Sequence, residues 1–361
     1  MHSHFISYFG EPGTGGSLKL EITSKSGEII ESGFFINRSS GKKYPIVRGI
    51  PRFIDPREDT YANSFAYQWH KWPRVQFESE NVGKPMEGHT LGMWERIVGF
   101  QERCLDLAGK TVVDIGCGPG RFIDVARSKG ATVIGIDYSG AVEVARDNFS
   151  HDPNVCICQG DALRLPLRSG SLDGAFSIGV LHHTPEPEKG VKDAFRILNA
   201  GGWFGLSVYG RGGYYDFPSL QVWRKLFNVL WPLFKHYPPL AYTYVTNYAL
   251  RPIAVAVPFV GKAIRVFFPF VKLPDRQWSI LDTFDSITPC YQSAHESYEV
   301  FSWLKKAGFQ QIEPSNWGFC AFAGLKPAEG VAPNSEENCT SEECTVDHVR
   351  SSENLCHDRF E

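Results

Sequence analysis

The sequence predicts an α/β fold with a doubly wound parallel sheet, and three observations within residues 111–210 support this. Residues 112–115 form an apolar run that is typical of a buried strand, and a glycine-rich turn and a run with helical spacing follow it. A second apolar run, residues 132–137, ends in Asp137, where an acidic group suits a ribose diol. Further apolar runs then alternate with helical patterns, which is the order of a Rossmann-like sheet.

The turn after the first strand narrows the choice of ligand. It reads Asp114-x-Gly116-x-Gly118-x-Gly120, and its glycines let backbone N–H groups approach a ligand closely. The dinucleotide fingerprint G-x-G-x-x-G would need glycine at position 121, where Arg121 stands. The turn therefore argues against a nicotinamide or flavin dinucleotide.

The complete series resembles the motifs of the class I methyltransferases that use S-adenosylmethionine (SAM), in particular the type 11 branch that includes ubiquinone and menaquinone C-methyltransferases. The resemblance covers residues 105–210 closely and residues 294–326 loosely. It implies a seven-stranded sheet, SAM as cofactor and methyl transfer as the reaction, with Asp161 and its neighbour holding the adenine. We expect these residues to bind the cofactor: Asp114, Gly116, Cys117, Gly118, Gly120, Asp137, Tyr138, Asp161, Ala162 and Ser177.

The other elements of the sheet follow in order along residues 111–326, which we assign to the methyltransferase domain. We expect strands at 155–159, 171–177 and 203–209, helices at 95–107, 186–198 and 297–308, and a closing antiparallel pair at 311–314 and 319–324.

Composition fits one large domain with additions. The chain has 361 residues, is 42% hydrophobic and carries a net charge of −3, so no basic field attracts nucleic acid. Its first residues lack the basic-then-apolar layout of a signal peptide, and we expect a cytoplasmic protein, or one peripheral to the inner face of a membrane. The nine cysteines are then interpreted as reduced thiols. The oligomeric state stays open.

Residues 1–55 predict a small β module. Residues 1–16 are glycine-rich and expected to be loose, whereas residues 17–55 alternate polar and apolar positions between turn signals, as short antiparallel strands do. Residues 44–53 resemble the end of the zinc-ribbon module shared with tRNA-methyltransferase activator proteins. The first cysteine of the chain is Cys104, so a tetrahedral thiolate site cannot form in this module and we expect no metal.

Two flanking regions complete the domain plan. Residues 56–110 predict a helical connector, and their aromatic segment 64–72 resembles one that leads a helix over the cofactor in related methyltransferases. This segment is either a lid on SAM or a hydrophobic seam between domains. Residues 327–361 are polar and acidic, and we expect them to be disordered.

Residues 210–293 are expected to be a helical insertion between the fifth and sixth strands. The segment is apolar and aromatic, but it lacks an uncharged stretch long enough to span a bilayer. Two interpretations remain: a cap over an apolar substrate pocket, which we favour, or amphipathic helices that contact a membrane through residues 210–273.

The sequence says less about the residues that contact the methyl acceptor than about those that bind the cofactor. His183 follows the fourth strand and is the candidate general base, because imidazole titrates near neutrality; a structural loop histidine is the alternative. Asp282, Asp285 and Tyr291 are the other polar groups expected to face the pocket. The fourth strand ends without the Asn/Asp-Pro-Pro-Tyr motif of enzymes that methylate exocyclic or amide nitrogens.

These observations leave an O or C atom, or an amine nitrogen, of a small lipophilic or amphiphilic acceptor. Two other functions remain open. A non-catalytic SAM-binding scaffold is disfavoured by the intact Asp137 and Asp161. An RNA methyltransferase is disfavoured by the acidic charge balance, and we expect no nucleic-acid partner.

Overall fold

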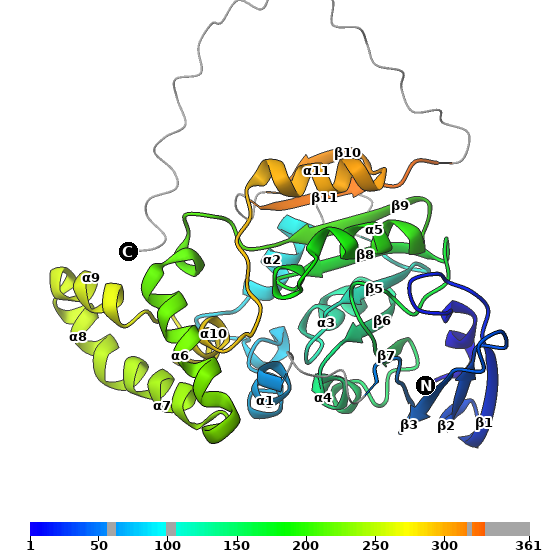
Figure 1. Cartoon of the computed structure of the whole chain (residues 1–361), viewed down its shortest axis with the longest axis horizontal. Helices are drawn as coiled ribbons and strands as arrows, with labels where there is room; N and C mark the ends of the chain where they lie inside the picture. The colour runs from blue at the N-terminus through cyan, green and yellow to red at the C-terminus, as the bar shows by residue number, and fades with distance from the viewer. Residues whose placement is uncertain (56–62, 99–105, 316–319, 329–361) are drawn as a thin grey trace, which may run out of the picture. The chain divides into compact units, whose positions relative to one another are not determined.

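The computed structural model describes residues 1–55, 63–98, 106–315 and 320–328. The tail that was expected to be disordered lies outside the described residues from position 329 onward. The centre of the fold is a seven-stranded sheet with helices on both faces (Figure 1).

The sheet has the order β10-β11-β9-β8-β5-β6-β7, which confirms the predicted seven-stranded Rossmann-like architecture. Neighbouring strands from β7 to β9 are parallel, whereas β11 is antiparallel to both β9 and β10. The strands are β5 (Thr111–Ile115), β6 (Thr132–Asp137), β7 (Val155–Gln159), β8 (Leu172–Ile178), β9 (Leu198–Ser207), β10 (Gln310–Pro314) and β11 (Ala321–Leu325). The chain order reverses between β5 and β8, and this switch point is where open α/β sheets bind ligands.

Alternating side chains of the strands build two apolar layers. On β5, Val112 packs with α2 (His89–Ile97), α3 (Arg121–Ser128) and α4 (Ala141–Asn148). Its neighbour Val113 packs on the opposite face with α5 (Pro187–Ile197) and α11 (Ser297–Ala307). The predicted start of the helix before β5 was wrong, because α2 begins at His89; residues 99–105 lie outside the described part of the chain.

The N-terminal module is a four-stranded antiparallel sheet in the order β1-β2-β3-β4. Its strands are β1 (Lys19–Ser26), β2 (Ile29–Ile36), β3 (Lys43–Val47) and β4 (Ile50–Pro51). The expectation that residues 1–16 are loose was wrong. They contain a 3-10 helix, Ser3–Tyr8, and the fully buried rings of Phe5 and Phe9 join the apolar layer that contains α5 and α11. Apolar burial therefore outweighs the glycine content of the segment.

The module attaches to the edge of the large sheet. The Phe53 N–H donates to the carbonyl of Gln159 at 2.8 Å, and Arg52 forms a bridge to the same residue of β7. Arg52 also pairs with Glu143 of α4. An edge strand with unpaired backbone groups is a template for aggregation, so the module protects β7 (Figure 1).

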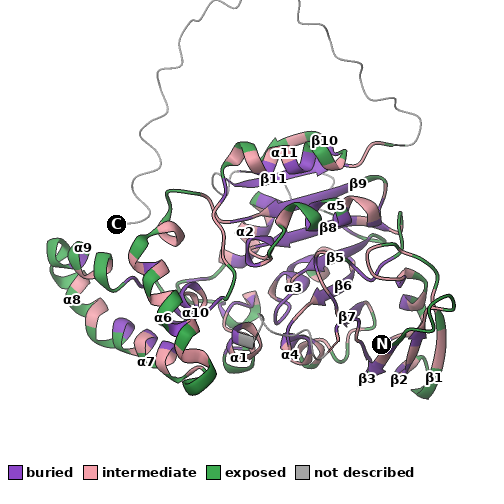
Figure 2. Cartoon of the chain, in the orientation of Figure 1, coloured by how far each residue is buried: buried purple, intermediate pink, exposed green. Residues whose placement is uncertain are grey.

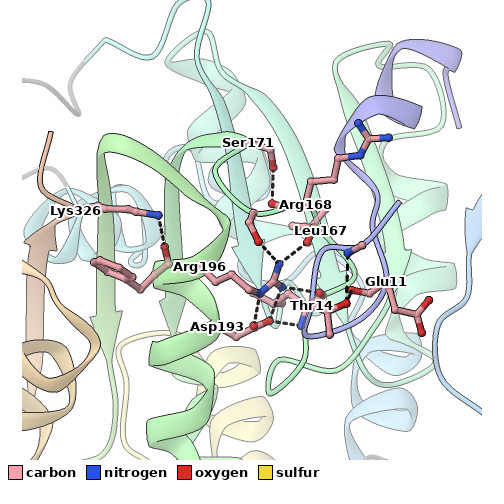
Figure 3. Close-up of polar contacts among 12 residues, drawn as sticks. Glu11, Thr14, Leu167, Arg168, Ser171, Asp193, Arg196 and Lys326 are labelled. Carbon is pink, nitrogen blue, oxygen red and sulfur yellow. Dashed lines mark hydrogen bonds and ion pairs between the residues drawn. The ribbon is translucent and has the colours of Figure 1, made fainter. Parts of the chain in front are cut away.

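A network around Arg196 of α5 fixes the loop that follows β7. Its guanidinium donates to the carbonyls of Leu165 (3.0 Å) and Leu167 (2.7 Å) and pairs with Asp193 at 2.6 Å (Figure 3). On the other side of the loop, Arg168 donates from Nε to the carbonyl of Phe9 at 3.2 Å. The N-terminal segment and α5 therefore hold this loop between them.

The expected helical insertion lies between β9 and β10 along the chain and contains several short helices (Figure 1). They are α6 (Pro218–Phe234), α7 (Tyr237–Val245), a π-helix (Thr246–Leu250), α8 (Arg251–Ala256), α9 (Pro258–Phe267) and α10 (Arg276–Ile287). α10 packs against α1 (Asn63–Lys71) as well as α6 and α7. Among the described residues, no helix combines the length and apolarity needed to cross a membrane.

The N-terminal module is expected to fold without zinc. Among the described residues, no group of three or more His, Cys, Asp or Glu side chains is placed to hold a metal ion. We expect the same unfolding temperature by calorimetry in excess EDTA and in zinc. As a positive control, Phe9→Ala should cost about 3–5 kcal/mol through the lost burial. One tightly held zinc per chain, with a lower unfolding temperature on chelation, would contradict the prediction.

Candidate cofactor and acceptor site

The glycine-rich turn connects β5 to α3 at the carboxyl edge of the sheet. Gly116, Gly118 and Gly120 have φ values of 83°, 53° and 97°, in the left-handed region that favours glycine. A Cβ on Gly116 would lie 2.3 Å from the Val180 side chain, and one on Gly120 would lie 2.4 Å from the Phe149 ring. The turn therefore needs glycine for both its backbone conformation and its close packing.

Asp137 links this turn to the end of β6. Its Oδ2 accepts from the Gly118 N–H at 2.9 Å, and its Oδ1 accepts from the N–H and the hydroxyl of Ser139 at 2.8 and 2.7 Å. Burial raises the pKa of Asp137, although these hydrogen bonds oppose the shift. The carboxylate thus lies directly beside the turn, where the sequence placed the ribose contact.

Asp114 provides the test of whether the turn fits SAM. Its side chain is 1% exposed, and its Oδ2 is buried without a hydrogen-bond partner in the structure. Burial raises the pKa of Asp114 well above its usual value, and the nearby Asp137 raises it further. A buried carboxyl beside a glycine cradle fits the cationic methionine part of SAM, because a positive charge there would stabilise the carboxylate.

Two further predicted cofactor residues, Asp161 and Ala162, follow the end of β7. Asp161 accepts from the Leu163 N–H at 2.9 Å and pairs with Arg164, and Ala162 beside it is buried. The Arg196 network described above holds the loop that follows them (Figure 3). Their contact with adenine stays a prediction.

The other three predicted cofactor residues make contacts within the fold. The Ser177 hydroxyl is buried and donates to the Ile115 carbonyl at 3.1 Å, so that side chain ties β8 to β5. Burial raises the pKa of the Cys117 thiol well above its usual value, which makes it a neutral apolar neighbour. Tyr138 accepts from Gln159 through its carbonyl at 3.1 Å.

Helix α1, from the aromatic segment of the connector, lies over the turn. A Cβ built on Gly118 would be 3.0 Å from Nε1 of Trp69. The same helix packs against α4 and α10, and its Gln68 donates to Oδ1 of Asp285 at 3.0 Å. α1 therefore lies beside the turn and also packs against the insertion. Its role as a lid on SAM stays a prediction.

His183 lies at the end of β8, in the short helix Leu181–His183. Its Nδ1 is 3.0 Å from the Tyr291 carbonyl, which can only accept, so Nδ1 carries the proton and Nε2 has the free lone pair. Burial lowers the pKa of His183, whereas the nearby Asp285 raises it. The imidazole is therefore held neutral with Nε2 as a proton acceptor.

Two carboxyl groups of α10 face the same region. Asp282 accepts from Gln76 at 3.1 Å, and Asp285 accepts from Gln68 at 3.0 Å. Burial raises the pKa of Asp282 to about 7, while the Arg121 guanidinium opposes this shift. The insertion thus supplies a carboxyl group that titrates near neutral pH.

Tyr209 connects the carboxyl groups with the histidines. Its hydroxyl donates to Oδ2 of Asp285 at 3.4 Å, and its ring centroid lies 5.5 Å from that of His183. Its ring also lies 3.7 Å from that of His182, whose two nitrogens are buried without hydrogen-bond partners in the structure. The structure thus brings residues that follow β8 and β9 together with residues of α1, α3 and α10. We call Arg121, His183, Tyr209, Asp282 and Asp285 the acceptor cluster.

Sequence reasoning missed several members of this site and misplaced one. The position of Tyr209 directly after the fifth strand could have indicated a site residue. Arg121 was used only to exclude a dinucleotide motif. No sequence pattern pointed to Gln68 or Gln76 as site residues. Tyr291 was expected to face the pocket with its side chain. Instead, Tyr291 is 46% exposed, and its backbone carbonyl is the atom that contacts His183.

Comparisons with known proteins agree with this geometry. The family model described as "Methyltransferase domain" matches residues 113–206. The chain is 35% identical over 242 residues to a demethylmenaquinone methyltransferase of Lactococcus lactis, which covers 65% of this chain and 79% of that protein. It is also 31% identical over 161 residues to a ubiquinone biosynthesis O-methyltransferase of Cupriavidus pinatubonensis, covering 44% of this chain and 60% of that protein.

Other relatives match over shorter stretches. The chain is 34% identical over 120 residues to a probable tRNA methyltransferase 9B of Mus musculus, covering 32% of this chain and 25% of that protein. The chain spans about a third or less of the length of several curated relatives that it matches.

Three findings identify the same family. They are the glycine turn with Asp114 and Asp137, the strand order of the sheet, and the match along most of the Lactococcus lactis protein. SAM is the methyl donor. The chain belongs to the class I SAM-dependent methyltransferases.

Proposed function

We propose that this chain methylates an O or C atom of a small lipophilic acceptor that carries an acidic hydroxyl, such as a phenol or a quinol. The observation that carries the proposal is Asp282, half-buried near Arg121 and Asp285, whose pKa is raised to about 7. A base is most effective when its pKa lies near the working pH, and phenolic or enolic protons are within its reach. An amine nitrogen remains an acceptor that the same base would serve.

The role of the protein residues follows from their positions. Bound SAM supplies an electrophilic methyl group. The acceptor cluster orients the hydroxyl of the acceptor, and ionised Asp282 takes its proton while Arg121 stabilises the carboxylate. His183 is a second candidate base through Nε2, as the sequence proposed. α1 and α10 exclude water from above the glycine turn.

The names of the relatives support a quinone-like acceptor over RNA. The two quinone methyltransferases are covered over 79% and 60% of their lengths, against 25% for the probable tRNA enzyme. The net charge of −3 also provides no general attraction for a polyanion.

The test is turnover on defined acceptors. Purified protein is incubated with SAM and, separately, with a demethylmenaquinol, a polyprenyl phenol, an alkylamine or bulk tRNA. Mass spectrometry then measures S-adenosylhomocysteine and the methylated product. We expect product with a phenol or quinol and none with tRNA. Methylation of tRNA alone would contradict the proposal, and SAM binding without turnover on any acceptor would favour the scaffold alternative.

A further inference from the structure

The insertion carries an unusual distribution of charge. Residues 217–274 contain no Asp or Glu, whereas they contain seven Lys or Arg residues. This segment therefore has a formal charge of +7 within a chain whose total is −3. A basic segment of this kind is attracted to an anionic surface.

The same segment exposes most of the large apolar side chains that are exposed in the structure. Of the 22 such residues among those described, 17 lie between Phe217 and Phe268. Phe259 is 87% exposed, Leu233 78%, Val229 74% and Phe267 68%. Figure 2 shows the corresponding helices α6, α8 and α9 with long exposed stretches. We call α6–α9 with their exposed apolar and basic side chains the insertion face.

The hairpin of α8 and α9 has almost no interior of its own. Gly261 is its one buried residue, and a Cβ there would lie 2.3 Å from the Ala254 carbonyl oxygen. This glycine lets the two helices pack closely, so the larger side chains around it point outward. Exposed apolar area of this extent is costly in water and indicates a partner that is itself apolar.

Two other partners could cover the insertion face, but each explains its exposed apolar and basic side chains less well. The acidic segment 329–361 matches its charge, with nine Asp or Glu against two Arg. However, that segment contains only five large apolar residues (Val331, Val346, Val349, Leu355 and Phe360), too few to cover the seventeen exposed ones. A second copy of the chain would place one +7 segment against another, which is repulsive.

We propose that the insertion face docks on an anionic lipid bilayer, with its apolar side chains in the interface and its lysines at the headgroups. Short helices with exposed aromatic and aliphatic residues and a basic, acid-free sequence have the chemistry of interfacial helices. The seven positive charges and the absence of acidic residues supply the charge complementarity to an anionic surface. The proposal does not depend on the acceptor, because it concerns binding alone.

The experiment measures sedimentation of the full chain with vesicles. Vesicles of phosphatidylcholine alone are compared with vesicles that also contain phosphatidylglycerol, at low and high salt. We expect binding that is about tenfold or more stronger on the phosphatidylglycerol vesicles and that falls with salt. Equal sedimentation with and without vesicles would overturn the proposal.

Matched variants separate the two contributions. Phe259→Ser with Phe267→Ser should lose binding, whereas Tyr298→Ser on α11, 81% exposed, should keep it. Lys225→Glu with Lys262→Glu should weaken binding about tenfold or more, and Lys192→Glu with Lys305→Glu, which makes the same change in net charge outside the insertion, should not. All seven positions are exposed, so folding should be unaffected, and circular dichroism checks this.

Sedimentation velocity distinguishes the second copy. A dimer in the absence of lipid that Phe259→Ser with Phe267→Ser dissociates would assign the insertion face to self-association and overturn the membrane proposal. A monomer that binds anionic vesicles and is released by either insertion variant supports it.

Discussion

Replacing Asp282 by Asn is expected to lower kcat about a hundredfold or more, while the affinity for SAM changes little. A positioned general base contributes roughly 10²–10⁴-fold to a rate, and the amide cannot accept the proton. Asn preserves the shape, and its oxygen can still accept from Gln76. Single-turnover measurements on the acceptor found in the product screen give the rate, and calorimetry gives the SAM affinity.

The pH dependence gives an independent readout. Because the base must be ionised, kcat of the parent should rise as the pH passes through about 7 and then level off. The Asn variant should lose this rise. The contribution of Asp282 to the free energy of unfolding should fall over the pH range in which kcat rises. The folded-state pKa of Asp282 lies above its usual value of 3.8, so its contribution to stability is present at low pH and is lost as the pH rises through about 7.

The control is another carboxylate of the same helix. Asp275 is the N-cap of α10 and accepts from the Trp278 N–H at 3.0 Å. Asn caps helices as well as Asp, so Asp275→Asn removes one negative charge from α10 and should leave kcat unchanged. Equal activities of Asp282→Asn and the parent would remove Asp282 from the reaction and leave His183 as the base.

The parallel sheet could be predicted because its information is local. Each strand is a short apolar run, each turn carries glycine or acidic residues, and Asp114, Asp137 and Asp161 fall at successive strand ends. Since the carboxyl ends of parallel strands meet at one edge, a correct strand order also places the cofactor residues.

The acceptor cluster could not be predicted in full because it depends on packing between distant segments. Arg121 and Asp282 are 161 positions apart, and the raised pKa of Asp282 arises from burial that no local pattern encodes. The burial of Phe5 and Phe9 was missed for the same reason: the Phe9 ring contacts Phe35 and Phe53, and both rings join an apolar cluster built from distant segments. In the insertion, the sequence showed apolar content but not which side chains remain exposed.

Asp137→Ala is expected to weaken SAM binding by roughly tenfold to a hundredfold or more. A hydrogen bond to a charged group contributes about 1.5–3 kcal/mol, and the ribose contact would be lost. The alanine also frees the Gly118 N–H and Ser139 from their acceptor, so the glycine turn loses the carboxylate that fixes it to β6. The lost ribose contact and the loosened glycine turn both weaken SAM binding. Isothermal calorimetry with SAM measures the dissociation constant, and the SAM-induced rise in unfolding temperature should shrink with it.

Asp147→Ala is the matched control, because it removes the same charge from α4, where the side chain is 62% exposed and pairs with Arg146. A surface pair of this kind contributes little, so both stability and SAM affinity should match the parent. If Asp137→Ala also bound SAM like the parent, the ribose would have to be held elsewhere, and the assignment of the β6 end to the cofactor would fail. If the affinity fell but a saturating SAM concentration restored kcat, Asp137 would act in binding alone, which agrees with its hydrogen bond to the glycine turn.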